Sequence, residues 1–244
     1  MRRFQFARRA PGRPAIATFW WDVCQSLSAL FVKIGFGLRV TGRERIPKTG
    51  PLLYLSNHQS FMDPAINGAL IHDRPFRPFA RETLFRGPFG WLIHSLGALP
   101  VSGGGGDKAV MRAAIAELKA GRCVLIYPEG TRCPDGTVKT FKSGIALLLK
   151  RADATIVPIG IDGAFDAWPR DSSRPRWRRP IECEAGTPIT AKDLLADGVP
   201  EALQRLEREV DELRLRCRAR LRARFGPDVP APGPGDRALS DSSE

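Results

Sequence analysis

The sequence predicts an α/β fold in which a mixed, largely parallel sheet is covered by helices on both faces. Three short apolar runs, at residues 52–55, 123–127 and 155–161, are typical of strands buried on both sides of a sheet. Residues 107–120 carry apolar side chains at helical spacing and are followed by Gly121, which ends the helix. This alternation favours the α/β class, and 244 residues are enough for one such domain with a sizeable core.

The first 40 residues are expected to form a basic arm and an amphipathic helical segment that associates with a membrane. Residues 1–14 are basic, whereas residues 15–40 are apolar and aromatic and are interrupted by Asp22 and Lys33. The uncharged piece between these two charges is only half of the roughly 20 residues that a spanning helix needs. One or two amphipathic helices are therefore expected, either as ordinary core helices or in the membrane interface, which the Trp20–Trp21 pair favours.

Residues 41–225 are assigned to the α/β domain, and residues 226–244, rich in proline, glycine and serine, to a disordered tail. The stretch at 87–106 has no formal charge, but its prolines and glycines exclude a straight spanning helix, so a helix and then a strand are expected within 89–101. The other expected elements are helices at 63–71, 143–151 and 200–225, an extended piece at 78–80 and an edge strand at 181–185.

The composition narrows the possible partners. The chain has 38 Lys and Arg residues against 26 Asp and Glu residues, a net charge of +12, which attracts phosphate on anionic lipid, nucleic acid or a cofactor. The five cysteines include no Cys-x-x-Cys pair, which indicates reduced thiols in a cytosolic compartment. No cluster of His and Cys has the spacing of a metal site, so no structural metal is expected.

His58 and Asp63 lie in the segment that joins the apolar run at 52–55 to the next helix. Asp63 precedes Pro64, a pair that suits a helix start, so the chain is expected to turn there and bring the carboxylate to the imidazole. A carboxylate on one ring nitrogen fixes the tautomer and leaves the other nitrogen free to accept a proton. The pair predicts a general base with its orienting group; a loop hydrogen bond made by His58 is the simpler alternative.

A second polar segment, residues 128–132, follows the second predicted strand. Ligands of open α/β sheets collect at the carboxyl ends of the strands. Gly130 lets the backbone approach a ligand, Thr131 offers a donor, and Arg132 can grip phosphate in a bidentate fork. Glu129 is expected to hold Arg132 in place. The alternative is a surface turn that carries an ion pair.

Taken in order, these segments resemble the glycerolipid acyltransferase family that includes bacterial 1-acyl-sn-glycerol-3-phosphate acyltransferases, also called lysophosphatidic acid acyltransferases. The first motif of that family, N-H-x-x-x-x-D, is matched by Asn57, His58 and Asp63. The later motifs are matched by residues 80–101, 128–132 with 141–144, and 156–161, and the resemblance covers residues 40–190.

The resemblance implies O-acyl transfer from a thioester of CoA or acyl-carrier protein to the free hydroxyl of 1-acyl-glycerol-3-phosphate, which gives phosphatidic acid in phospholipid biosynthesis. It implies that His58 is the general base, that Asp63 orients it, and that neither a metal nor a further cofactor takes part. The substrate-binding residues that it implies are Glu129, Gly130, Thr131, Arg132, Arg81 and Lys142.

One motif departs from the pattern of the family. The second motif usually ends V-x-R, and its arginine holds the phosphate of the acceptor, whereas residues 101–103 read Val-Ser-Gly. Either Arg81, Lys108 or Arg112 supplies the missing charge, or the acceptor has another headgroup. The alternatives are therefore a lyso-ornithine lipid, another lysophospholipid or glycerol 3-phosphate as acceptor, and a non-catalytic lipid-binding protein of the same fold.

The expected partners are a lysophospholipid acceptor, acyl-CoA or acyl-carrier protein, and an anionic membrane surface. The membrane is favoured by the basic surplus together with the apolar N-terminal segment. Nucleic acid is not expected as a partner, because only the net charge and the interleaved Trp and Arg residues at 162–180 favour it. The protein is expected on the cytoplasmic face of the cell membrane, as a peripheral or monotopic protein.

Overall fold

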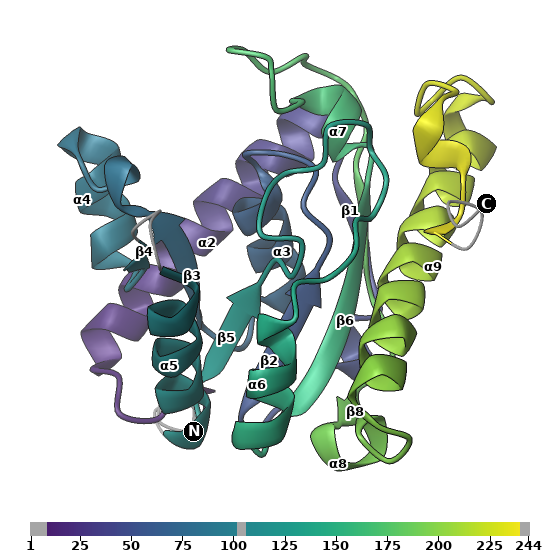
Figure 1. The fold of residues 1–244 in the computed structure, drawn as a ribbon. Helices are drawn as coiled ribbons and strands as arrows, with labels where there is room; N and C mark the ends of the chain where they lie inside the picture. Colours follow the sequence, from purple (N-terminus) through teal and green to yellow (C-terminus); the bar gives the residue numbers. More distant parts are fainter. Residues whose placement is uncertain (1–8, 102–105, 240–244) are drawn as a thin grey trace.

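A computed structural model of the protein describes residues 9–101 and 106–239, and an eight-stranded sheet lies within them (Figure 1). The strand order is β1-β7-β6-β2-β5-β3-β4, and β8 pairs with β6 beside this path. The strands are β1 Arg39–Thr41, β2 Leu52–Ser56, β3 Phe76–Arg81, β4 Leu99–Val101, β5 Cys123–Ile126, β6 Thr155–Asp162, β7 Glu182–Ala185 and β8 Ile189–Thr190.

Most strand pairs in the sheet are parallel. The central strand β2 is parallel to β5 and β6, β3 is parallel to β5 and β4, and β1 is parallel to β7. Among the described strands, the antiparallel pairs are those of β7 and β8 with β6. The sheet is thus mixed and largely parallel, as predicted, and the carboxyl ends of β2 and β5 reach the same edge.

Helices cover both faces of the sheet (Figure 1). Alternate residues of β2 serve the two faces: Tyr54 packs in one core with Leu70 and Phe76, whereas Leu53 packs in the other with Leu148 and Leu206. The first core lies under α2 Ala15–Phe36 and α3 Asp63–Ile71, and the second under α5 Gly106–Lys119, α6 Gly144–Arg151 and α9 Val199–Phe225. The short helices are α4 Gly87–Ser95, α7 Ala164–Ala167 and α8 Ala191–Leu194, and the 3-10 turns are η1 Arg43–Arg45, η2 Glu82–Leu84 and η3 Pro234–Asp236.

The strand predicted at 181–185 exists, but it is not an edge strand. β7 pairs with β6 on one side and β1 on the other, and its four residues are all buried. The edge is formed by β1, a strand of three residues with mostly exposed side chains. A strand this short and exposed has no apolar pattern that would predict it. The sequence therefore predicts the edge at the neighbouring strand, β7.

The N-terminal segment forms one long helix, α2, with one face packed on the domain. Trp21 meets the ring of Phe76 at 5.0 Å between centroids, and Asp22 is paired with Arg9 at 2.8 Å. By length and composition α2 is apolar enough to cross a membrane, yet it also lies against α3 through Gln25. The large apolar side chains on its other face are exposed: Ile16, Phe19, Leu27, Leu30, Phe31 and Ile34.

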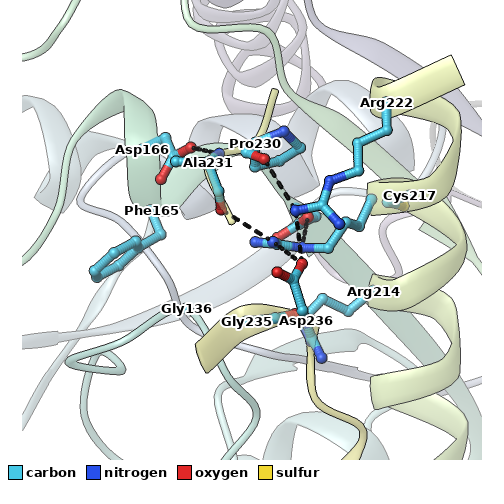
Figure 2. A network of polar contacts seen from close by, with 12 residues as sticks. Gly136, Phe165, Asp166, Arg214, Cys217, Arg222, Pro230, Ala231, Gly235 and Asp236 are labelled. Atoms are coloured by element: carbon cyan, nitrogen blue, oxygen red, sulfur yellow. Dashed lines mark hydrogen bonds and ion pairs between the residues drawn. The ribbon is translucent and has the colours of Figure 1, made fainter. Parts of the chain in front are cut away.

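The C-terminal segment does not follow the expected disorder in the part that the structure describes, residues 226–239. Figure 2 shows this segment folded onto α9, where Asp236 pairs with Arg222 at 2.7 Å. Asp236 also accepts a hydrogen bond from Arg218 at 2.7 Å. Arg214 donates to the Gly235 carbonyl at 2.6 Å. Composition predicts disorder because it cannot show that one face of α9 supplies donors to this segment. Residues 240–244 lie outside the described residues, as do the start of the basic arm, residues 1–8, and the glycine run at 102–105.

Candidate active site

His58 and Asp63 meet at the carboxyl end of β2, as the sequence predicts. The Nδ1 of His58 lies 2.7 Å from the Oδ2 of Asp63, at the first residue of α3. The Asp63 carboxylate is fully buried, whereas 20% of the His58 side chain is exposed. Among the described residues no protein group bonds the Nε2 of His58. The buried carboxylate therefore fixes the tautomer and leaves Nε2 able to accept a proton.

The turn between the two residues is stabilised by the same carboxylate oxygen. Asp63 Oδ2 also accepts the backbone N–H groups of Gln59 at 2.6 Å and Ser60 at 2.8 Å. Asn57 joins β2 to β6: its side chain donates to the Ile161 carbonyl at 2.9 Å and accepts the Ile161 N–H at 2.8 Å. The segment that carries His58 is thus anchored on both sides, which keeps the imidazole in one position.

The side chain of Gln59 makes a second set of contacts that the sequence does not predict. Its amide donates to the Gly136 carbonyl and to Asp162, both at 3.0 Å, and accepts the N–H of Phe165 at 3.2 Å. Asp162, buried at the end of β6, in turn accepts a hydrogen bond from Arg218 of α9 at 2.9 Å. The residue next to His58 therefore connects the turn to three other elements, and no spacing rule indicates such a contact.

Tyr127 packs against the imidazole ring of His58. Its ring stacks on that of His58, with centroids 4.0 Å apart and planes 14° apart. The Tyr127 hydroxyl accepts from the Asn67 side chain at 3.2 Å, and burial raises its pKa well above the ordinary value, so the phenol stays neutral. In the sequence Tyr127 is one residue of an apolar run, and nothing in its spacing predicts a contact with His58.

Glu129 bonds to backbone groups beside the His58–Asp63 pair (the dyad) and not to Arg132, so the expectation that it holds Arg132 in place is not met. Its Oε1 accepts the N–H of His58 at 2.8 Å, and its Oε2 accepts the N–H of Lys139 at 3.2 Å. No ion pair joins Glu129 to Arg132 in the part of the chain that the structure describes. Because the His58 carbonyl also accepts the N–H of Cys133 at 2.8 Å, the turn at 128–133 and the His58 segment are fixed to each other.

Burial makes Glu129 an unusual carboxyl group: it raises the pKa to about 8, although the two backbone N–H groups that Glu129 accepts act in the opposite direction. The native carboxyl thus keeps its proton over a range in which the unfolded chain, with a pKa near 4.5, has lost it. Because the native state binds more protons there, the free energy of unfolding falls as the pH rises between these two values.

The free energy of unfolding of the Glu129→Gln variant is therefore expected to depend less on pH than that of the unsubstituted protein. The amide of the variant cannot titrate. The free energy of unfolding of the variant minus that of the unsubstituted protein should therefore increase as the pH rises from 5 to 7.5, at most by about 1.4 kcal/mol per pH unit. Urea unfolding of both proteins at several pH values in this range measures the difference. A difference that stays constant with pH would show that Glu129 is ionised in the native state.

Arg132 lies beside the turn at residues 58–63. Its guanidinium is placed over the ring of Phe61, 4.8 Å from the centroid. Burial lowers its pKa, as do the positive charges of Arg170 and Arg81, while Asp63 raises it. The charge of Arg132 therefore interacts with those of Asp63, Arg170 and Arg81.

The other predicted binding residues border this site. Gly130 has a φ of +73°, and a Cβ there would collide with the Lys142 side chain, so the glycine makes room for Lys142 as well as for a turn. Thr131 is exposed and its hydroxyl accepts from Arg170 at 3.4 Å. Arg81 is exposed at the end of β3. The side chain of Lys142 occupies the space above Gly130, and the binding roles of these residues stay predictions.

A buried carboxylate that orients an imidazole, with a basic turn beside it at the carboxyl edge of a parallel sheet, defines a site that can take a proton from a hydroxyl group on an anionic substrate. Residues 37–162, just over half of the chain, match the family described as Acyltransferase, and the chain belongs to this family.

Two curated relatives show the range of activities found among similar proteins. The chain is 33% identical over 132 residues to a 1-acyl-sn-glycerol-3-phosphate acyltransferase of Borreliella burgdorferi, with 51% of each chain covered. It is 31% identical over 156 residues to a lyso-ornithine lipid O-acyltransferase of Pseudomonas aeruginosa, with 62% of this chain and 56% of that protein covered. The match thus spans about half the length of these relatives.

A solved structure has the same fold. The crystal structure of the 1-acyl-sn-glycerophosphate acyltransferase of Thermotoga maritima matches with a TM-score of 0.69 and 24% sequence identity. The match covers 90% of this chain and 84% of that one. The two chains therefore share the same overall fold.

Proposed function

We propose that the protein is an O-acyltransferase of phospholipid biosynthesis, which moves a fatty acyl group from a CoA or acyl-carrier-protein thioester to the free hydroxyl of 1-acyl-glycerol-3-phosphate. The product is phosphatidic acid. The observation that carries the proposal is the 2.7 Å contact between His58 Nδ1 and the buried Asp63 carboxylate, which leaves Nε2 open to an acceptor. The similarity to acyltransferases that act on lysolipids supports the choice of substrates.

In this mechanism His58 Nε2 takes the proton of the acceptor hydroxyl as its oxygen attacks the thioester carbonyl. Asp63 stabilises the imidazolium that results. Collapse of the tetrahedral intermediate breaks the carbon–sulfur bond, and the departing thiolate takes up the proton from the imidazolium. The thioester is already activated, so no acyl group needs to be held on the enzyme. Arg132 binds the phosphate of the acceptor, with Thr131, Lys142 and Arg81 at the border of the site.

A lyso-ornithine lipid is the second candidate acceptor. It is favoured by the similarity to the Pseudomonas aeruginosa enzyme and by the glycine at position 103, where a phosphate-binding arginine is usual in the family. One labelled acyl-CoA, offered with 1-acyl-glycerol-3-phosphate, a lyso-ornithine lipid or glycerol 3-phosphate, tests the choice. We expect the highest kcat/KM with 1-acyl-glycerol-3-phosphate. A higher value with the lyso-ornithine lipid would make that lipid the assigned acceptor. If none of the three accepts an acyl group, the proposed function is refuted.

The proposal includes the cytoplasmic face of the cell membrane as the place where the protein works. It is supported by the exposed apolar face of α2, by the net charge of +12 and by five cysteines that include no Cys-x-x-Cys pair. The substrates are amphiphiles that reside in or at the membrane. A monotopic helix on its surface would bring the dyad within reach of them.

The double variant Leu27→Glu/Ile34→Glu is expected to bind membranes more than tenfold more weakly than the unsubstituted protein. These side chains are 63% and 75% exposed, and each would lose about 1.5–3 kcal/mol of apolar burial in the interface. Flotation with vesicles of phosphatidylglycerol and phosphatidylethanolamine measures the binding. Leu147→Glu, at an exposed apolar position of α6, is the matched control. Equal flotation of all three proteins would exclude α2 as the membrane-binding surface.

A further inference from the structure

Three arginine residues, Arg81, Arg132 and Arg170, influence one another's charge beside the His58–Asp63 pair. Arg170 donates to the hydroxyl of Thr131, the residue before Arg132, at 3.4 Å. Burial and the positive charges of Arg170 and Arg81 lower the pKa of Arg132, whereas the carboxylates of Asp63 and Asp171 raise it. Among the described residues, none of the three arginines makes an ion pair with Asp or Glu. Like charges repel when they are brought together, so this group of arginines is suited to an anion that carries more than one negative charge.

The segment that carries Arg170 is held against the turn at residues 58–63. The Trp168 ring stacks on Phe61, with centroids 5.8 Å apart, and Phe61 is the ring that lies under the Arg132 guanidinium. Ser60 donates from its hydroxyl to the Trp168 carbonyl at 3.0 Å, and the Trp168 indole N–H donates to the Ser172 carbonyl at 2.9 Å. The backbone on both sides of Arg170 is thereby fixed beside the dyad, although the Arg170 side chain itself is exposed.

We propose that Arg170 determines headgroup specificity: together with Arg132 it recognises a phosphomonoester dianion, and it supplies a positive charge in a chain that has glycine at position 103. This inference rests on the proposed acyl transfer and adds a residue to it. Two guanidinium groups that approach one phosphate from adjacent elements bind the dianion more strongly than the monoanion of a phosphodiester. A headgroup esterified at the phosphate would lose both the second charge and one oxygen acceptor.

The test compares acceptors that differ only at the phosphate: 1-acyl-glycerol-3-phosphate, a monoester, and 1-acyl-glycerophosphoglycerol, a diester. We expect Arg170→Ala to raise the KM for the monoester roughly tenfold, with kcat within about twofold, and to change the KM for the diester by less than about threefold. Arg170→Lys should recover part of the loss, because it restores the charge without the fork. Arg174→Ala removes an exposed arginine of the same loop and should leave both values unchanged.

The outcomes separate this inference from the proposed function. If wild type acylates the monoester and Arg170→Ala has the same KM as Arg174→Ala, the inference is wrong and the function stands. If Arg170→Ala impairs both acceptors equally, the residue contributes only general positive charge, which also overturns it. Calorimetric binding of glycerol 3-phosphate is independent of turnover. A loss of binding in Arg170→Ala but not in Arg174→Ala supports the inference even if no acyl transfer occurs, and unchanged binding contradicts it.

Discussion

The His58→Ala variant is expected to lose acyl transfer almost completely, with kcat lower by about 10³–10⁴-fold, at the upper end of what a general base contributes. The Nδ1 of His58 contacts Asp63 at 2.7 Å, and among the described residues no protein group bonds its Nε2. Without it, no group is positioned to take the proton of the acceptor hydroxyl. Initial rates with saturating 1-acyl-glycerol-3-phosphate and acyl-CoA measure the loss.

The fold should tolerate this change, because the His58 side chain is partly exposed and its backbone contacts do not depend on the ring. Thermal unfolding of the variant is therefore the control. Asp63→Asn is the matched variant: its amide oxygen can still accept the N–H groups of Gln59 and Ser60, yet it cannot stabilise an imidazolium by charge. A His58→Ala protein that folds normally and keeps more than about a tenth of the activity would refute the role of His58 as the base.

The second large effect is expected on stability, in the Asp162→Ala variant. Asp162 is buried and accepts from Arg218 at 2.9 Å and from Gln59 at 3.0 Å. Its removal leaves a buried guanidinium and a buried amide each without one partner, which costs about 3–5 kcal/mol. For a chain of this size that corresponds to a decrease in Tm on the order of 10 °C.

The same variant should also lose activity, since Gln59 donates its N–H to Asp63 and its side chain is anchored on Asp162. Thermal and urea unfolding measure the loss of stability. The loss of activity is measured as kcat at a temperature below the thermal unfolding transition. Asp166→Ala is the control, because that carboxylate accepts only the exposed N–H of Ala231, at 2.9 Å, among the described residues (Figure 2). A stability of Asp162→Ala within about 1 kcal/mol of Asp166→Ala would show that the buried network contributes little.

The strands at the centre of the sheet could be predicted because their residues are apolar on both faces. β2, β5 and β6 are such strands, and His58 and Asp63 follow from one of them through a helix start that the Asp-Pro pair marks. The dyad could thus be predicted from local rules together with the resemblance. The helices α5 and α9 could also be predicted from their amphipathic patterns, because one face of each packs against the core.

What could not be predicted depends on contacts between residues far apart in the chain. The hydrogen bond from the His58 N–H to Glu129 joins segments 71 residues apart, and the contact of Gln59 with Asp162 spans 103 residues. Spacing rules describe neighbours on one helix or strand, so they assigned Glu129 to the nearby Arg132 instead. Residues 226–239 were misjudged for the same reason, because Arg214 and Arg218 of α9 supply the hydrogen bonds that order this segment.

The most direct test of the central claim, that His58 activates a lysolipid hydroxyl for attack on a thioester, is the release of CoA thiol with and without an acceptor. We predict rapid, continuous thiol release from acyl-CoA in the presence of 1-acyl-glycerol-3-phosphate. In its absence, and in the His58→Ala variant with acceptor present, release should remain near the rate of spontaneous hydrolysis. A burst of thiol equal to the enzyme concentration without acceptor, or release that His58→Ala leaves unchanged, would contradict the claim.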